Sequence, residues 1–125
     1  MKPIVVERKT RMPESQGGGL VTRHLYWCPG CDNLHGIVIQ PGKQANGASW
    51  SFEGSLECPT YSPSQLTQFE GGPPEARQKF VCHTFIRGGM IQFLGDCTHE
   101  LRGQTVPMVP VPDWLIQEGE QGADE

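Results

Sequence analysis

Residues 80–94 read FVCHTFIRGGMIQFL, and in this stretch two apolar runs flank Gly88-Gly89. A two-residue glycine loop between such runs is typical of a β-hairpin, because both loop positions require a positive φ. The spacing places Arg87 opposite Met90 and Phe85 opposite Gln92. We therefore expect an antiparallel hairpin here as the clearest element of the fold.

The rest of the chain has the composition of short strands joined by turns. Sixteen Gly and eleven Pro residues interrupt it too often for long helices, and β-branched and aromatic residues cluster between them. The Pro-rich stretch 58–64 is expected to be an extended loop. Strands are expected at 4–6, 20–27, 35–40 and 50–52, with at best an edge strand at 106–111. The predicted fold class is mainly β, a small antiparallel sheet of short strands with little helix, organised around one zinc site.

Length and charge limit the number of domains and the kind of partner. A chain of 125 residues builds one hydrophobic core more readily than two, so residues 1–125 are predicted to form a single domain. The formal net charge is -4 and no run of Lys or Arg exceeds Arg8-Lys9, which argues against binding to nucleic acid. Acidic residues gather near the end, and about 113–125 is interpreted as a solvated tail.

The cellular compartment is inferred from the apolar runs and the cysteines. No apolar run approaches the roughly 20 residues that cross a bilayer, and the start of the chain lacks the apolar segment of a signal peptide. We therefore expect no membrane association and a cytoplasmic location in a host cell. Thiols stay reduced there, so five cysteines in this chain indicate a metal or redox chemistry before disulfides.

The strongest local signal is Cys28-Pro29-Gly30-Cys31, which has the form of a zinc knuckle. Two thiolates three positions apart on a tight turn both reach a tetrahedral ion at about 2.3 Å. The alternative is a thioredoxin-like redox pair, which needs a helix that begins at the motif and lowers a thiol pKa. The following run Ile37-Val38-Ile39 is β-branched and lacks helical periodicity, so the knuckle is favoured.

A zinc site needs two further ligands, and the second half of the chain offers two adjacent pairs. These are Cys82-His83, on the first hairpin strand, and Cys97-Thr98-His99, just past the second. In the expected register Phe80 lies opposite Cys97, so both pairs converge near the open end of the hairpin. His35 is a weaker candidate, and Cys58 is interpreted as a free thiol.

Several motifs in this order resemble a family of small phage and prophage proteins of unknown function, whose members are often mislabelled as ammonia monooxygenase. The resemblance spans about residues 20–112. A related branch, found beside bacterial ubiquitin-like conjugation genes, shares a knuckle, a Pro-Ser loop and a strand of the form Cys-x-x-His-aromatic. The motifs that carry the resemblance are Trp27-Cys28-Pro29-Gly30-Cys31, Trp50-Ser51-Phe52-Glu53-Gly54, Pro59-Thr60-Tyr61-Ser62-Pro63-Ser64, Cys82-His83-Thr84-Phe85-Ile86-Arg87 and Gln92-Phe93-Leu94-Gly95-Asp96-Cys97-Thr98-His99.

The resemblance to this branch implies a choice among the ligands. The histidine of the branch falls on His83, and its cysteine falls on position 80, where this chain has Phe80. Cys97, opposite Phe80 in the expected register, then supplies the missing sulfur. The predicted zinc ligands are therefore Cys28, Cys31, His83 and Cys97, with Cys82 and His99 as alternates.

The function that follows is a phage or prophage accessory protein with a structural zinc site that binds a host or virion protein. A site filled by three sulfurs and one nitrogen leaves no open position for a substrate. The alternative is a metal-dependent or Cys/His-dependent enzyme, with Cys82 or His99 catalytic and Asp96 orienting a histidine as general base. Ser62 and Ser64 are interpreted as part of a proline loop that packs over the sheet. The oligomeric state stays open.

Overall fold

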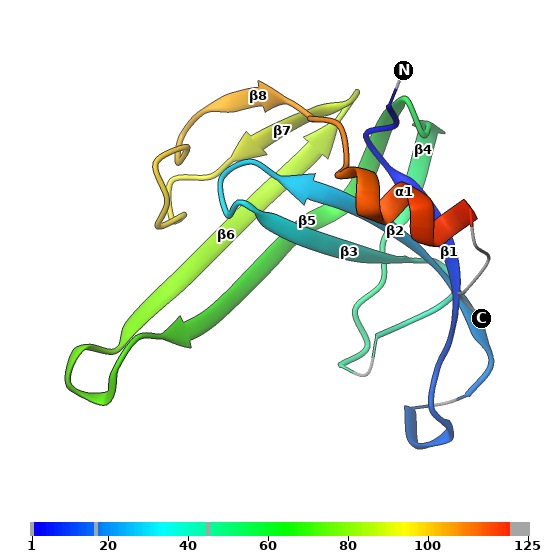
Figure 1. Cartoon of the computed structure of the whole chain (residues 1–125), viewed down its shortest axis with the longest axis horizontal. Coiled ribbons are helices and arrows are strands. Elements are labelled where there is room, and N and C mark those ends of the chain that lie inside the picture. The colour runs from blue at the N-terminus through cyan, green and yellow to red at the C-terminus, as the bar shows by residue number, and fades with distance from the viewer. Residues whose placement is uncertain (1, 17, 45, 121–125) are drawn as a thin grey trace.

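The computed structural model describes residues 2–16, 18–44 and 46–120, whose strands form two antiparallel sheets (Figure 1). The orders are β1-β2-β3 and β4-β5-β6-β7-β8. One α-helix and two short 3-10 helices complete the described elements, so the mainly β fold class is confirmed. The bounds are β1 Val6–Arg11, η1 Glu14–Gln16, β2 Leu20–Cys28, β3 Asn33–Ile39, β4 Ser51–Ser55, β5 Cys58–Gly71, η2 Pro74–Ala76, β6 Gln78–Arg87, β7 Met90–Phe93, β8 Thr105–Pro107 and α1 Asp113–Glu120.

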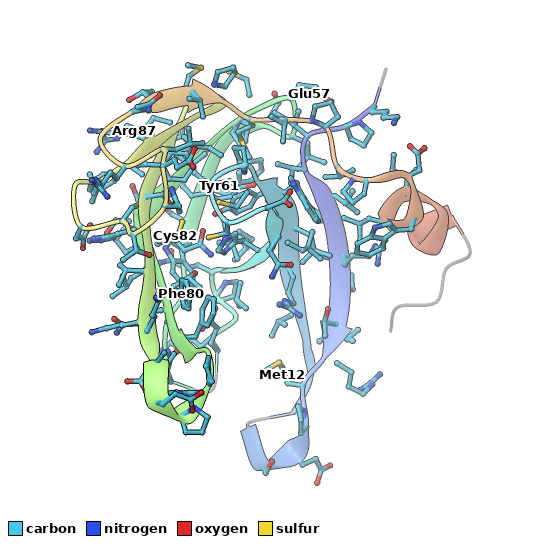
Figure 2. All side chains as sticks on the ribbon, turned by 60° about the vertical axis from the view of Figure 1, so that its left-hand side comes forward. Met12, Glu57, Tyr61, Phe80, Cys82 and Arg87 are labelled. Atoms are coloured by element: carbon cyan, nitrogen blue, oxygen red, sulfur yellow. The ribbon has the colours of Figure 1, made fainter. Side chains whose placement is uncertain are left out.

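Side chains from both sheets are buried in one hydrophobic cluster. Tyr26 comes from the three-stranded sheet, and Tyr61 and Phe93 come from the five-stranded sheet. Figure 2 shows Tyr61 and Cys82 pointing into the space between the sheets. Because full burial of one large apolar side chain stabilises a fold by about 1.5–3 kcal/mol, this shared core holds the two sheets together. The Tyr26 hydroxyl also donates a hydrogen bond to Gln65 Oε1 at 2.5 Å.

The β6–β7 hairpin confirms the register expected from the sequence. Arg87 pairs with Met90, and Phe85 pairs with Gln92. Both loop glycines have a positive φ, 57° at Gly88 and 77° at Gly89, as a tight loop of this kind requires.

Strand β5 replaces the extended loop that was expected at 58–64. It pairs with β4 on one side and with β6 on the other. The register with β6 shifts between Tyr61, which faces Ile86, and Gln65, which faces Thr84. Three residues, 62–64, therefore stand where β6 has only Phe85. The expectation of a loop was wrong because a bulge of this kind accommodates Pro63 without ending the strand.

The C-terminal part begins with a packed helix rather than with the tail expected from about residue 113. Helix α1 buries Leu115, and the Leu115 carbonyl accepts a hydrogen bond from Arg8 Nη2 at 2.6 Å. Residues 121–125 of the expected tail lie outside the described residues. In the part of the chain that the structure describes, no helix has the length and apolarity to span a membrane.

Candidate functional site

The knuckle forms the turn between β2 and β3. Cys28 is the last residue of β2, and residues 29–32 form the turn, which closes with a 2.8 Å hydrogen bond from the Asp32 N–H to the Cys28 carbonyl. The Cys31 N–H donates to Cys28 Sγ at 3.4 Å. Strand β3 follows directly, so no helix begins at the motif as a thioredoxin-like redox pair requires.

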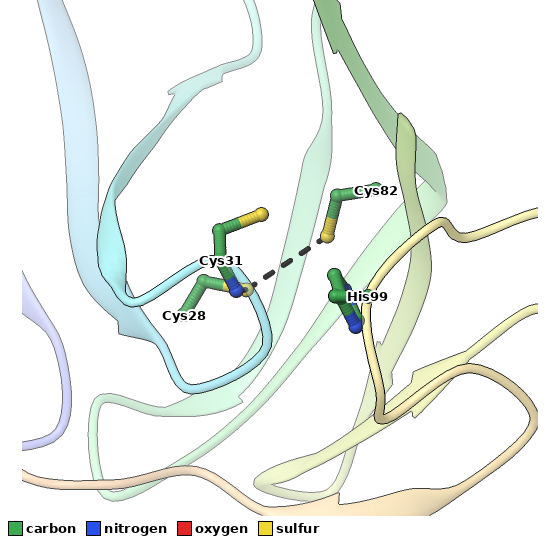
Figure 3. Close-up of side chains that lie close together, drawn as sticks. All are labelled: Cys28, Cys31, Cys82 and His99. Atoms are coloured by element: carbon green, nitrogen blue, oxygen red, sulfur yellow. Dashed lines mark hydrogen bonds between the residues drawn. The ribbon is translucent and has the colours of Figure 1, made fainter. Parts of the chain in front are cut away.

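Cys82 and His99 complete a cluster at this turn (Figure 3). One ligand atom from each of Cys28, Cys31, Cys82 and His99 lies within 4.8 Å of the others. The sulfurs of Cys28 and Cys82 are 3.8 Å apart. Sulfurs at about 2.3 Å from a tetrahedral ion are held about 3.8 Å from one another, so this spacing fits a common metal ion.

His99 packs directly against the knuckle. A Cβ at Gly30 would lie only 2.3 Å from His99 Cε1, so the ring occupies space that any side chain at position 30 would fill. His99 Nδ1 accepts a hydrogen bond from the Leu101 N–H at 3.2 Å, whereas buried Nε2 has no hydrogen-bond partner among the described residues. An unpaired buried ring nitrogen beside three thiols fits a metal ligand, because an unsatisfied polar atom is otherwise costly.

The pKa values of the three thiols also fit a metal site. The hydrogen bond with Cys82 lowers the pKa of Cys28 to about 4, and burial opposes this change. The same hydrogen bond raises the pKa of Cys82 strongly. Burial, followed by the charge of Cys28, raises the pKa of Cys31 to about 11. The three sulfurs by themselves therefore favour a single thiolate, and further thiolates require a cation between them.

The structure places the two alternate residues at the knuckle and the preferred pair, His83 and Cys97, outside the cluster. Adjacent strand residues point to opposite faces, so buried Cys82 faces the core while His83 faces away from it. Cys97 is buried, but its sulfur lies 3.3 Å from the main-chain nitrogen of His83.

The turn after β7 explains this arrangement. The Cys97 N–H donates to the Leu94 carbonyl at 3.1 Å, which bends the chain before it can continue opposite Phe80. The Thr98 N–H then donates to the Val81 carbonyl at 3.0 Å. This bend places His99, rather than Cys97, beside Cys82.

The two remaining candidates lie outside the cluster. His35 is buried, stacks on Tyr26 with ring centroids 5.5 Å apart, and has its Nδ1 3.3 Å from Thr67 Oγ1. Its ring lies near enough to Cys28 to contribute to the low pKa of that thiol. Cys58 is an exposed free cysteine at the start of β5.

On the other face of β6, His83 joins a second polar constellation. Its Nε2 lies 3.1 Å from Ser64 Oγ, and its Nδ1 lies 3.0 Å from Asp96 Oδ2. A hydroxyl, an imidazole and a carboxylate in this order make up a nucleophile, a general base and the group that orients the base. The Asp96 side chain is 56% exposed, so the solvent screens its charge more than in a buried triad.

Three parts of the fold bring these side chains together. Ser64 lies in the β5 bulge, and its carbonyl accepts a 3.2 Å hydrogen bond from Trp50 Nε1. His83 lies on β6, and its carbonyl accepts a hydrogen bond from the Leu94 N–H at 2.9 Å. Asp96 lies in the turn that follows β7. Ser64 is therefore held by the five-stranded sheet and by Trp50.

Sequence reasoning missed Ser64 as a functional residue and assigned His83 to the metal. Pro59 and Pro63 precede Ser64 and favour the interpretation as a packing loop, and no glycine-flanked serine motif marks it. The available signal was the pairing of Asp96 with a histidine, which the sequence analysis noted only for an enzyme that used Cys82 or His99.

A groove of about 680 Å³ opens beside Ser64. It lies between β3, the segment that precedes β4, and the part of β5 around the bulge. Its lining includes Leu34, Gly36, Trp50, Ser64 and Leu66. A serine at the wall of such a groove is accessible to a bound molecule.

Comparison with known families gives a match to the model of BubE, described as the bacterial ubiquitination-like system serine protease. The match covers residues 3–94 and so includes Ser64, His83 and the three cysteines of the cluster, and it ends just before Asp96 and His99. Comparisons with curated proteins and with solved structures give no significant match. The match agrees with the resemblance to a branch near ubiquitin-like conjugation genes. Because the family model covers well over half of the sequence, the chain belongs to the BubE family.

Proposed function

We propose that this protein is a serine peptidase in which Ser64 is the nucleophile, His83 is the general base and Asp96 orients the imidazole. The observation that carries the proposal is the unbroken chain of contacts from Ser64 Oγ through both nitrogens of His83 to Asp96, at 3.1 and 3.0 Å. Both distances lie within the range that proton transfer and orientation require. The family description supports the same class of reaction.

The residues have defined roles in this reaction. His83 Nε2 takes the proton of Ser64 Oγ as the oxygen attacks the substrate carbonyl, and then passes it to the leaving amine. Asp96 accepts a hydrogen bond from the Nδ1–H of His83, which fixes the tautomer whose Nε2 is free to act as base. Water then attacks the acyl group on Ser64, and His83 acts again as base to release the acid.

We propose that Cys28, Cys31, Cys82 and His99 hold one zinc ion, and that its role is structural. Three thiolates and one imidazole fill the four positions of a tetrahedral ion, which leaves none for substrate. Bound zinc supplies a cross-link between the turn of the three-stranded sheet, strand β6 and the turn after β7. Cys82 is adjacent to His83, and His99 is three residues from Asp96, so these ligands also position two members of the triad.

The proposed function is enzymatic, but it differs both from the non-catalytic accessory protein and from the kind of enzyme that the sequence suggested as an alternative. A closed metal site does not support a metal-dependent or Cys/His-dependent reaction, whereas the serine triad lies on the opposite face of β6. We propose that the partner is a protein substrate of a ubiquitination-like system in the cytoplasm of the host cell. The phage or prophage origin remains a prediction from the sequence.

Active-site labelling tests the proposal. A fluorophosphonate probe forms a bond to an activated serine Oγ, so we expect it to label the wild-type protein and the Ser62→Ala variant. We expect labelling to be lost in Ser64→Ala. Ser62 is the matched control, because it lies two residues away in the same bulge and is exposed. Equal labelling of Ser64→Ala and wild type, or no labelling of the folded wild-type protein, contradicts the proposed function.

A further inference from the structure

The groove beside Ser64 is bordered by a free strand edge. Strand β3 is the last strand of its sheet; it pairs with β2, and its last residue, Ile39, forms an isolated bridge with Trp50. Near its C-terminal end, the outer side is covered by Trp50, whose N–H donates to the Val38 carbonyl at 3.0 Å. Closer to the groove, Leu34 and Gly36 line the open side together with Ser64.

The alternation of β3 determines which main-chain groups face the groove. In an antiparallel pair, every second residue directs both its N–H and its carbonyl away from the partner strand. The Val38 carbonyl bonds to Trp50 on the outer side, and two residues earlier the Gly36 carbonyl accepts a hydrogen bond from Gln65 Nε2 at 3.1 Å. Gly36 and Leu34 therefore belong to the outward set.

Leu34 and Gly36 each leave one outward group for a ligand. The Leu34 N–H is taken by Asn33 Oδ1 at 2.8 Å, and the Gly36 carbonyl is taken by Gln65. The Leu34 carbonyl and the Gly36 N–H remain without an outward partner among the residues that the structure describes. They flank His35, the spacing at which an added strand forms two hydrogen bonds.

The chemistry of the groove limits the side chains that fit. The described residues that line it include Leu34, His35, Ala48, Trp50 and Leu66, together with neutral amides and hydroxyls, and none of them is Asp, Glu, Lys or Arg. A charged side chain would lose water there without gaining an opposite charge. The groove therefore favours uncharged residues.

We propose that β3 binds the substrate as an added strand: an extended, uncharged peptide segment that pairs with the Leu34 carbonyl and the Gly36 N–H and thereby lies across Ser64. This inference rests on the proposed function, because it names the substrate class of the same serine. Gln65, the residue that follows Ser64, donates a hydrogen bond to the Gly36 carbonyl. This contact fixes the position of the β3 edge relative to Ser64. A disordered tail of a protein satisfies these requirements, whereas a folded surface lacks a free strand to offer.

Peptidyl phosphonates of two lengths test the inference in the full chain. One probe carries a single alanine and the other carries four alanines before the reactive phosphorus, and both label an activated serine. We expect the longer probe to label wild-type Ser64 at least about tenfold faster, as two added main-chain hydrogen bonds imply. Replacement of its outer alanines by aspartate is expected to abolish this gain.

The Gly36→Pro variant removes the pairing N–H, and Gly36→Ala is its matched control. Both variants add a Cβ that meets Arg23 Nη2 at 2.5 Å, which is the far end of a flexible side chain. The two variants share this steric change, and only the proline also removes the N–H donor. Proline is tolerated on an edge strand where its nitrogen faces outward. We expect Gly36→Ala to keep the gain from the longer probe. We expect Gly36→Pro to lose it, so that this variant reacts with the four-alanine probe no faster than with the one-alanine probe.

The outcomes separate the two proposals. If Gly36→Pro keeps the length-dependent gain, or if the longer probe gives no gain with wild-type protein, the added strand is excluded while the nucleophile stands. If no probe labels Ser64 of the folded protein, the proposed function itself fails. Should Gly36→Pro not fold, a four-alanine probe that is N-methylated at each amide in turn replaces it, tested on wild-type protein. If N-methylation leaves the gain unchanged at every position, the inference is overturned.

Discussion

At the scale of single residues, the metal cluster depends on one close approach. His99 reaches the three sulfurs because position 30 has no side chain. The hydrogen bond from the Leu101 N–H and the edge-on contact with the Phe93 ring, with centroids 4.7 Å apart at 89°, hold the imidazole in this place. Gly30 is therefore needed for space and not for an unusual backbone conformation.

This space requirement predicts the effect of Gly30→Ala. The added Cβ displaces His99 from the knuckle, so we expect weaker zinc retention and a loss of about 1–3 kcal/mol in the free energy of unfolding. Denaturant unfolding and competition with a chromogenic chelator measure the two effects. Gly95→Ala is the control, because a Cβ at Gly95 meets nothing within 4 Å. Equal losses in both variants would show that His99 does not depend on Gly30.

At the scale of elements, a buried histidine links strands of the two sheets. His24 on β2 lies 2.6 Å from the Tyr61 hydroxyl on β5 and 2.9 Å from Glu7 Oε1 on β1. Tyr61 is the last residue of β5 in register before the bulge that carries Ser64. The network therefore anchors the strand at the point where its path departs from regular pairing.

The burial of His24 predicts how stability depends on pH. Desolvation lowers the pKa of His24 below its ordinary value, although the contact with Glu7 acts in the opposite direction. The unfolded chain therefore binds a proton at higher pH than the folded protein does, so the contribution of neutral His24 is complete above about pH 6.5 and is lost as the pH falls. We expect the zinc-bound protein to have a lower free energy of unfolding at pH 5.5 than at pH 7.5.

The His24→Gln variant isolates this contribution, because glutamine keeps a polar partner for Tyr61 and does not titrate. Denaturant unfolding at the two pH values should give a smaller difference for His24→Gln than for wild type. An unchanged difference would assign the pH dependence to other groups.

At the scale of the whole molecule, the four side chains of the cluster come from both sheets. Cys28 and Cys31 belong to the three-stranded sheet, whereas Cys82 belongs to the five-stranded sheet and His99 to the turn after β7. A cavity of about 610 Å³ borders Cys31, Cys82 and His99 and gives a chelator access to them.

We therefore expect one zinc per chain, and we expect chelation to lower the melting temperature and the labelling of Ser64 together. Structural zinc binding contributes directly to folding free energy, so removal of a ligand is severe. Cys28→Ser should destabilise the protein far more than Cys58→Ser, whose thiol is exposed and outside the cluster. Elemental analysis and thermal melts measure these effects. A folded, metal-free wild-type protein would exclude the structural role.

The features that could be predicted from the sequence are those that neighbouring residues determine. Gly88-Gly89 defines the β6–β7 register because the loop is two residues long. The turn of the knuckle places Cys28 and Cys31 side by side for the same reason, since Pro29 and Gly30 lie between them. The mainly β class follows from how often glycine and proline interrupt the chain.

The tertiary structure decided which distant residues meet. The register shift that brings Ser64 to His83 belongs to the pairing of β5 with β6, and the residues of β5 alone do not specify where their partner strand lies. The bend after Leu94 decides that His99, rather than Cys97, lies beside Cys82 at the knuckle. Strand alternation then sends Cys82 to the metal cluster and His83 to the triad. Sequence alone offered both neighbours as ligands, because the two faces of a strand become different only when each is packed against something else.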